Sequence, residues 1–163
     1  EPPSLDPSIA TDSGSVDVIT NMFIGLTRFN ENAEVEPWAA TDWEVSEDGR
    51  TYTFTLRDDL SWVSYDPESG ETAELRPLTA EDFEYGIKRT LDPNTASDYA
   101  YVLYIIEGGE AFNTADASGE DFESLREEVG VNAIDDSTLE VTFTDAISYA
   151  PSIMGMWITS RRG

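Results

Sequence analysis

Residues 51–56 carry the pattern that most restricts the fold, a strict alternation between threonine and a large apolar side chain. Successive side chains of a β-strand point to opposite faces of the sheet, so this alternation predicts a strand with one buried face. Trp43 and Val45 lie on one face of an earlier strand, and the polar residues 46–49 supply the turn between the two. The pattern therefore predicts an antiparallel hairpin with an apolar face to bury.

A second hairpin is predicted near the end of the chain, where residues 131–134 are followed by a turn at Asp135 and Asp136. The strand after this turn again alternates apolar with polar side chains, and its apolar members are Leu139, Val141 and Phe143. We expect the apolar faces of both hairpins to pack against a helix.

The best-defined helix is predicted after Thr79, because Thr79 and Asp82 have the spacing of a capping box. Apolar residues follow at helical spacing and form the face that is expected to cover the hairpins: Phe83, Ile87 and Leu91. Further helices are predicted from Ser13 to Gly25, over 110–112 and over 121–129.

Three other segments are predicted from weaker patterns. Residues 64–77 are polar and rich in helix and strand breakers, which favours an exposed loop. Residues 99–106 fit either a helix or a buried strand, and residues 149–158 fit a short helix or an exit strand. Hairpins interspersed with helices, without strand-helix-strand crossovers, indicate an α+β fold.

The charge of the chain excludes two classes of partner. Its 163 residues include 9 Lys+Arg and 34 Asp+Glu, which gives a net charge of −25. Such a chain cannot bind nucleic acid by neutralising phosphates, nor dock electrostatically on an anionic membrane. The acid excess suggests a protein kept soluble under salt or in an exposed setting.

The absence of cysteine and histidine excludes much chemistry from the chain itself. Thiol and Ser-His catalysis, Cys/His zinc sites and disulfides are all unavailable, and no cofactor is predicted. No stretch reaches the ~20 apolar residues that a membrane span needs. No secretion signal is present at Glu1, so we expect that any targeting segment has been removed.

Carboxylates remain as candidates for catalysis or metal binding, but acidic pairs are expected by chance among 34 of them. Asp135-Asp136 and similar pairs are therefore interpreted as solvated surface. The loops that start at Asp66 and Asp116 lack the Gly that calcium-binding EF-hand loops have at position six. No metal site is predicted.

Aromatic side chains fill cores and also line ligand clefts. Trp43 and Trp62 lie beside predicted strands and are assigned to the core. Tyr99, Tyr101 and Tyr104 cannot all face inward on one helix, so at least one is expected to border solvent or a cleft.

Seven motifs follow one another in an order that closely resembles the N-terminal part of family 5 extracellular solute-binding proteins. They are SLDP at 4–7, FIGLTR at 23–28, WEVSEDG at 43–49, TYTFTLR at 51–57, LTAEDF at 78–83, KRTLDPNTAS at 88–97 and AIDDSTLEV at 133–141. The family includes the oligopeptide- and dipeptide-binding receptors of ABC importers. One departure is that segment 63–77 replaces the tight Asp-Gly-x-Pro turn that is usual in the family after the tryptophan matching Trp62.

The resemblance implies a small mixed α/β domain, with antiparallel hairpins packed on helices, inserted in a type 2 periplasmic-binding-protein-like fold. It assigns residues 1–24 to the first ligand-binding lobe and residues 25–163 to the smaller inserted domain. Because family members run to several hundred residues, we expect the chain to be a fragment, with most ligand-binding groups outside it. We expect the fragment alone to bind peptides weakly or not detectably, because a two-lobe clamp gains affinity by enclosing its ligand.

The resemblance places two ligand-contact regions in this chain. One is the loop of Thr11, Asp12 and Ser13, whose backbone is expected to run along a bound peptide, and a plain turn is the alternative. The other is Tyr99, which is expected to face the ligand cleft, and core packing is the alternative.

The implied function is that of a substrate-binding component of an ABC importer, which is not an enzyme. It is expected to capture peptides outside the membrane, as a periplasmic protein or a cell-surface lipoprotein, and to deliver them to membrane permease subunits. A carboxylate-dependent glycoside hydrolase and a surface interaction domain remain alternatives from other classes. The residues do not identify the peptide or other solute.

Overall fold

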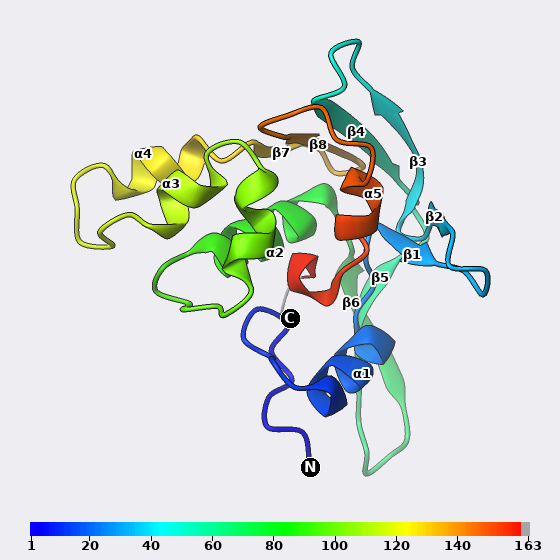
Figure 1. Cartoon of the computed structure of the whole chain (residues 1–163). Helices are drawn as coiled ribbons and strands as arrows, with labels where there is room; N and C mark the ends of the chain where they lie inside the picture. The colour runs from blue at the N-terminus through cyan, green and yellow to red at the C-terminus, as the bar shows by residue number, and fades with distance from the viewer. Residues whose placement is uncertain (161–163) are drawn as a thin grey trace.

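The centre of the fold is a four-stranded antiparallel sheet (Figure 1). The computed structural model describes residues 1–160. The strands of this sheet lie in the order β3 (Ala40–Val45), β4 (Thr51–Leu56), β8 (Thr138–Thr142) and β7 (Val131–Asp135). Both predicted hairpins are confirmed, and β4 pairs with β8 to join them into one sheet.

Helix α2 (Ala80–Leu91) contacts β7 and β8 and supplies the other half of the core. The side chains predicted to meet there are all buried: Tyr52, Phe54, Leu56, Phe83, Ile87, Leu91, Leu139, Val141 and Phe143. Each large apolar side chain that is fully buried in this way contributes about 1.5–3 kcal/mol. The helix begins as its sequence predicts, because Asp82 accepts a hydrogen bond from the backbone N–H of Thr79 at 3.0 Å.

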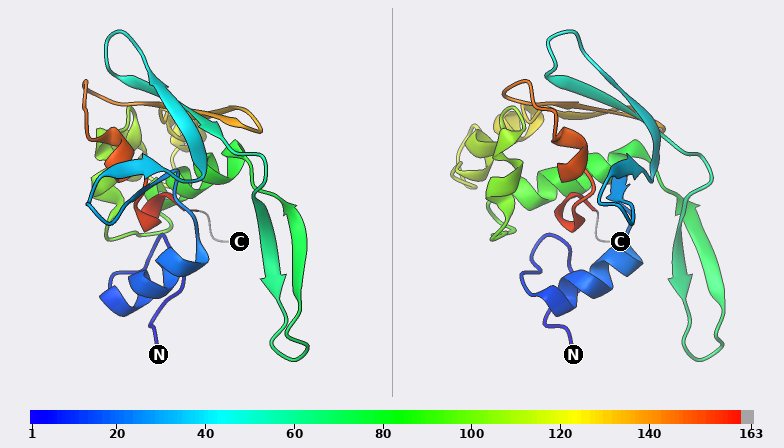
Figure 2. Two further views of the ribbon diagram at one scale, coloured as in Figure 1. Left: turned by 90° about the vertical axis from the view of Figure 1, so that its right-hand side faces the viewer. Right: turned by 45° about the vertical axis from the view of Figure 1, so that its right-hand side comes forward.

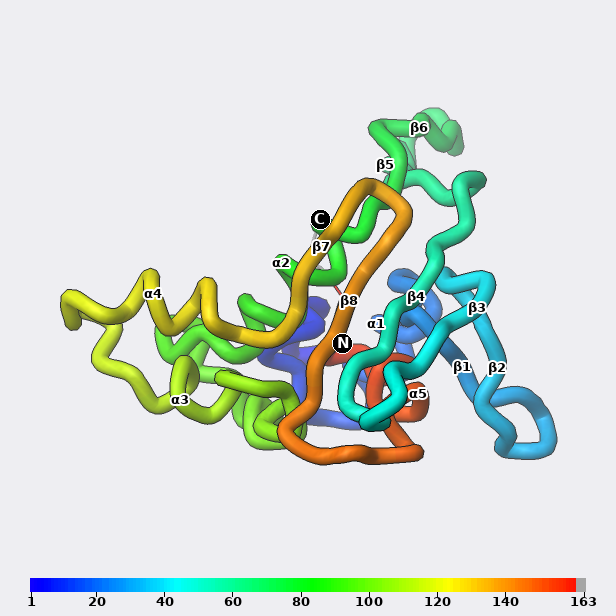
Figure 3. Tube along the Cα trace, turned by 90° about the horizontal axis from the view of Figure 1, so that it is seen from above, coloured from blue at the N-terminus to red at the C-terminus, as the bar shows by residue number. Residues whose placement is uncertain are grey.

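The other helical segments after α2 are short. They are η1 (Ala100–Ile105), α3 (Gly109–Asn113), α4 (Phe122–Glu127), α5 (Ala150–Ile153) and η2 (Trp157–Thr159). The ambiguous segment 99–106 is therefore mostly a 3-10 helix and not a buried strand. Figure 3 shows α3 and α4 at one end of the molecule and strands β1 (Thr27–Phe29) and β2 (Val35–Pro37) at the opposite end.

The prediction of an exposed loop over 64–77 is wrong in its secondary structure. Strands β5 (Ser61–Tyr65) and β6 (Thr72–Pro77) pair antiparallel, and Figure 2 shows them projecting from the body as a ribbon, which we call the arm. All residues of β6 are exposed, so no buried face imposed an apolar alternation on the sequence. The predicted exposure is correct, although the predicted loop is not.

The N-terminal segment carries α1 (Ser13–Met22) and is attached to α2 by polar contacts. The Arg89 guanidinium donates two hydrogen bonds of 2.7 Å to the Asp6 carboxylate. The Thr90 hydroxyl donates to the carbonyl of Ile158 at 2.8 Å and lies 3.0 Å from the Ser8 hydroxyl. The helix predicted to reach Gly25 ends at Met22.

Gly25, which follows α1, packs closely against Gly155. A Cβ atom on Gly25 would lie 3.1 Å from the Cα of Gly155, so the two backbones can approach this closely only because both residues are glycine. Among the described residues, no helix is long and apolar enough to cross a membrane.

Candidate functional site

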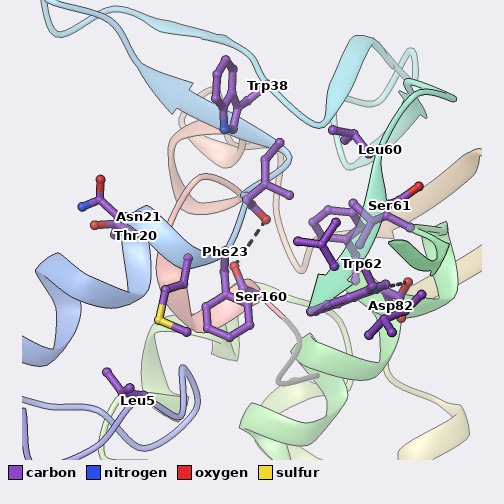
Figure 4. Close-up of a pocket in the computed structure, with 16 residues that line it drawn as sticks. Leu5, Thr20, Asn21, Phe23, Trp38, Leu60, Ser61, Trp62, Asp82 and Ser160 are labelled. Carbon is purple, nitrogen blue, oxygen red and sulfur yellow. Dashed lines mark hydrogen bonds between the residues drawn. The ribbon is translucent and has the colours of Figure 1, made fainter. Parts of the chain in front are cut away.

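A groove of about 780 Å³ lies between α1 and the arm (Figure 4). The start of α2 and Trp38, which follows β2, complete its walls. Most lining side chains are apolar, among them Leu5, Met22, Phe23, Trp62, Leu75 and Phe83. A contiguous apolar surface of this kind is typical of a site that binds a ligand or another protein segment.

The carboxylate of Asp82 attaches the base of the arm to α2. Its side chain is 2% exposed and accepts hydrogen bonds from Arg76 at 2.6 and 2.8 Å, from Trp62 Nε1 at 3.0 Å and from the Thr79 backbone at 3.0 Å. Burial acts to raise the pKa of Asp82, but the hydrogen bonds from Arg76, Trp62 and Thr79 outweigh it and lower the pKa to about 2. Asp82 is therefore a structural carboxylate that stays ionised.

The two tryptophans assigned to the core differ in their surroundings. Trp43 packs against the core as predicted, with its ring centroid 6.1 Å from that of Phe54. Trp62 is half-buried and lines the groove instead, with its ring 6.2 Å from Phe23 in an edge-on contact. The assignment of Trp62 to the core is wrong. The hydrogen bond from its indole N–H to Asp82 fixes the side chain at the base of the arm, where it lines the groove.

The first predicted contact loop forms the start of α1. Asp12 is the N-cap residue, and its side chain accepts a hydrogen bond from the backbone N–H of Ser15 at 2.9 Å. Hydrogen bonds from Ser15 hold the pKa of Asp12 below its ordinary value. Thr11 and Ser13 are exposed, so their backbone and side chains lie at the surface beside a helix N-terminus.

The second predicted contact residue, Tyr99, lies just before η1 and is half-buried. Its ring packs edge-on against Trp157, with centroids 5.5 Å apart. Tyr101 is 61% exposed, which confirms that the three neighbouring tyrosines do not all face inward. Tyr104 donates a hydrogen bond of 2.6 Å to Asn113.

The groove and the predicted contact residues are separate parts of the described surface, because Thr11, Asp12, Ser13 and Tyr99 do not line the groove. Sequence reasoning missed both the groove and the contacts of Asp82 beyond the capping box. One signal was present: Arg76 is the single basic residue within 64–77, and it lies six positions before Asp82.

The arrangement and the pKa values of the described carboxylates bear on metal binding and catalysis. No three Asp, Glu, His or Cys side chains there could jointly hold a metal ion. Every described carboxyl group whose pKa departs from its ordinary value has it lowered, as for Asp66, where the backbone N–H of Glu68 and the Ser69 hydroxyl stabilise the charge. A glycosidase needs the opposite, a carboxylic acid with a raised pKa.

Comparison with protein families gives one match that covers most of the chain. Residues 34–162 match the family described as bacterial extracellular solute-binding proteins, family 5 Middle. The oligopeptide-binding protein OppA of Bacillus subtilis is 45% identical over 91% of this chain and 24% of its own length. The dipeptide-binding protein DppE of the same organism is 40% identical over 94% of this chain and 25% of its own length.

Solved structures give the same result at the level of the fold. The substrate-binding domain of an oligopeptide ABC transporter from Bacillus anthracis superposes on 100% of this chain and 28% of its own, with a TM-score of 0.84 and 33% identity. The murein tripeptide binding protein MppA of Escherichia coli covers 100% of this chain and 29% of its own, with a TM-score of 0.79 and 29% identity. The predicted mixed α/β fold of a periplasmic binding protein is thus confirmed, and the chain spans about a quarter of the length of these relatives.

Proposed function

Because the chain belongs to the bacterial extracellular solute-binding proteins of family 5, we propose that it forms part of the substrate-binding component of an ABC importer that captures peptides. The observation that carries the proposal is the 45% identity to an oligopeptide-binding protein over 91% of this chain. Since the chain spans about a quarter of such proteins, peptide capture and delivery to permease subunits are proposed for a receptor of the full family length.

Family membership also answers the question of catalysis. Proteins of this family bind solutes for transport and are not enzymes. The lowered carboxyl pKa values described above also count against the glycoside hydrolase alternative.

We propose that residues 1–24 belong to the first ligand-binding lobe and residues 25–163 to the smaller inserted domain. Support comes from the surface of the N-terminal segment, which exposes apolar side chains that a lobe could cover: Leu5, Ile9, Val18 and Met22. The ion pair of Arg89 with the buried Asp6 then connects the two parts.

Thr11, Asp12, Ser13 and Tyr99 are proposed as the residues of this chain that contact the peptide. The first three are supported by their exposed or half-buried position at the N-terminus of α1, where backbone N–H groups are available to a carbonyl or carboxylate oxygen. Tyr99 is supported by its half-buried ring, one side of which packs on Trp157.

The location proposed for the receptor is outside the cytoplasmic membrane. The family is extracellular by description, and a relative in Escherichia coli is a periplasmic murein peptide-binding protein that is 37% identical over 86% of this chain. Tethering as a cell-surface lipoprotein is one form that this location can take.

Isothermal titration calorimetry on the full-length receptor tests the proposed function. We expect saturable binding of a mixture of short oligopeptides and no heat with sugars of similar mass, because recognition of a peptide depends on its backbone amides and charged ends. Turnover of chromogenic glycosides that a single Asp or Glu substitution abolishes would instead favour the hydrolase.

A further inference from the structure

We propose that the groove between α1 and the arm is the surface on which the rest of the full-length receptor packs. The proposal rests on the proposed function, because it places this chain in a receptor of the full family length. It assigns a partner to a surface that lies apart from the proposed peptide-contact residues.

The walls of the groove expose large apolar side chains that are costly to leave in water. Met22 on α1 is 57% exposed, and Val63 and Leu75 on the arm are 58% and 63% exposed. Phe23, which follows α1, and Trp62 on the arm line the same groove (Figure 4), with their ring centroids 6.2 Å apart. Apolar surface concentrated in one place in this way marks an interface.

The length of the relatives identifies the partner. The chain spans 24% of OppA and 25% of DppE, so about three quarters of a receptor of that length is available to cover the groove. Leu5 and Ser160, from the first and last parts of the described chain, both line it.

Charge disfavours a second copy of this chain as the occupant. Two copies would each bring a net charge of −25 to the interface. The turn of the arm adds local repulsion, because Asp66, Glu68 and Glu71 lie there without a basic residue between them. A segment with apolar side chains and a smaller negative charge fits the groove better.

The side chains of the groove are positioned by contacts within this chain. Asp82 fixes Trp62 and Arg76 at the base of the arm, and Phe23 after α1 contacts Trp62 edge-on. A surface fixed in advance loses little conformational entropy when another segment packs on it.

Methionine oxidation in the full-length receptor without peptide tests the proposal. Met22 is exposed in this chain, whereas Met154 is fully buried and serves as an internal reference. If the rest of the receptor covers the groove, hydrogen peroxide should oxidise Met22 about tenfold more slowly in the folded receptor than in urea, as measured by mass spectrometry. Oxidation of Met22 at the unfolded rate, with Met154 protected, overturns the proposal.

Charged substitutions give a second, independent readout. Met22→Asp should lower the Tm of the full-length receptor by about 2–4 °C, because it buries a carboxylate in an apolar interface. The matched control is Ile134→Asp on β7, where the side chain is 59% exposed and does not line the groove, and it should leave the Tm unchanged. Equal Tm values for the two variants contradict the proposal.

Two further outcomes would assign the groove to another occupant. Protection of Met22 that develops only when an oligopeptide is added would make the groove a ligand site. Protection that disappears on dilution, together with a dimer in analytical ultracentrifugation, would make it a contact between copies. A receptor that protects Met22 but binds no peptide would leave this proposal standing and remove the proposed function.

Discussion

The central sheet and the arm are both antiparallel β-structure, but only the sheet buries one of its faces. In β4 buried residues alternate with more accessible ones, whereas every residue of β6 is exposed. A two-stranded ribbon is marginally stable in water by itself, and the arm is held at its base by the polar contacts of Asp82. The comparison shows that apolar burial stabilises the sheet and that a buried carboxylate orients the arm.

The largest loss of stability is expected from a substitution in the sheet. Phe54→Ala should lower the free energy of unfolding by about 3–5 kcal/mol, because Phe54 on β4 is fully buried in the core and its loss leaves a cavity. The matched control on the arm is Tyr65→Ala, at a side chain that is 65% exposed and does not line the groove, and it should change the free energy by less than about 0.5 kcal/mol. Urea unfolding followed by circular dichroism measures both, and similar losses would show that the arm shares in the core.

A smaller loss of stability is expected from a substitution at the base of the arm. Asp82→Asn should cost about 1–3 kcal/mol, because it removes the negative charge that Arg76 and Trp62 share while leaving an oxygen for the Thr79 N–H. The control Asp59→Asn removes an exposed partner of Arg57 and should leave stability nearly unchanged. Hydrogen exchange should become faster in β5 and β6 but not in β4, and uniform acceleration would contradict a local role.

The lowered pKa of Asp82 predicts how the stabilisation by Asp82 depends on pH. The group titrates at about 2 in the folded chain and at 3.8 as its ordinary value, so ionised Asp82 stabilises the fold above about pH 4. This contribution is lost as the pH falls through about 2. Urea titrations between these pH values should show the difference between wild type and Asp82→Asn narrowing, and a constant difference would mean that the charge is not its source.

Added salt should slow hydrogen exchange more in the arm than in the sheet. The net charge of −25 repels itself throughout the chain, but the arm carries Asp66, Glu68, Glu71 and Glu74 against the single base Arg76. Raising NaCl from about 0.01 to about 1 M shortens the screening length from ~30 to ~3 Å. Hydrogen exchange in the arm should slow by a larger factor than in β4 and β8, and the reverse order would contradict this distribution of repulsion.

The sequence predicted the parts of the fold in which burial imposes a period. The alternation in β4 and β8 and the helical spacing in α2 follow from one buried face, so Phe54, Ile87 and Leu139 were found correctly. The arm was missed because neither of its faces is buried, and its pairing depends on register and on Asp82. The short η1 segment was left ambiguous because six residues are too few to separate helix from strand by periodicity.

The candidate site was predicted only through family resemblance. Capping by Asp12 is a local contact with Ser15, but the cap alone does not identify a peptide contact. The contact of Tyr99 with Trp157 joins residues far apart in the chain, and no residue spacing encodes it. The groove combines α1 with the arm and α2, which come much later in the sequence, so no local pattern could have indicated it.

Peptide titration of the full-length receptor with Tyr99→Ala and Tyr65→Ala variants tests the proposed function and site most directly. Loss of the Tyr99 ring should weaken binding by about 0.5–1.5 kcal/mol while the Tm stays nearly unchanged, because the ring is expected to line the cleft. Tyr65→Ala, at a side chain on the arm that is 65% exposed, should leave the affinity unchanged. Unchanged affinity in Tyr99→Ala with a large fall in Tm would show that Tyr99 is a core residue, and absence of peptide binding by the wild type would contradict the function itself.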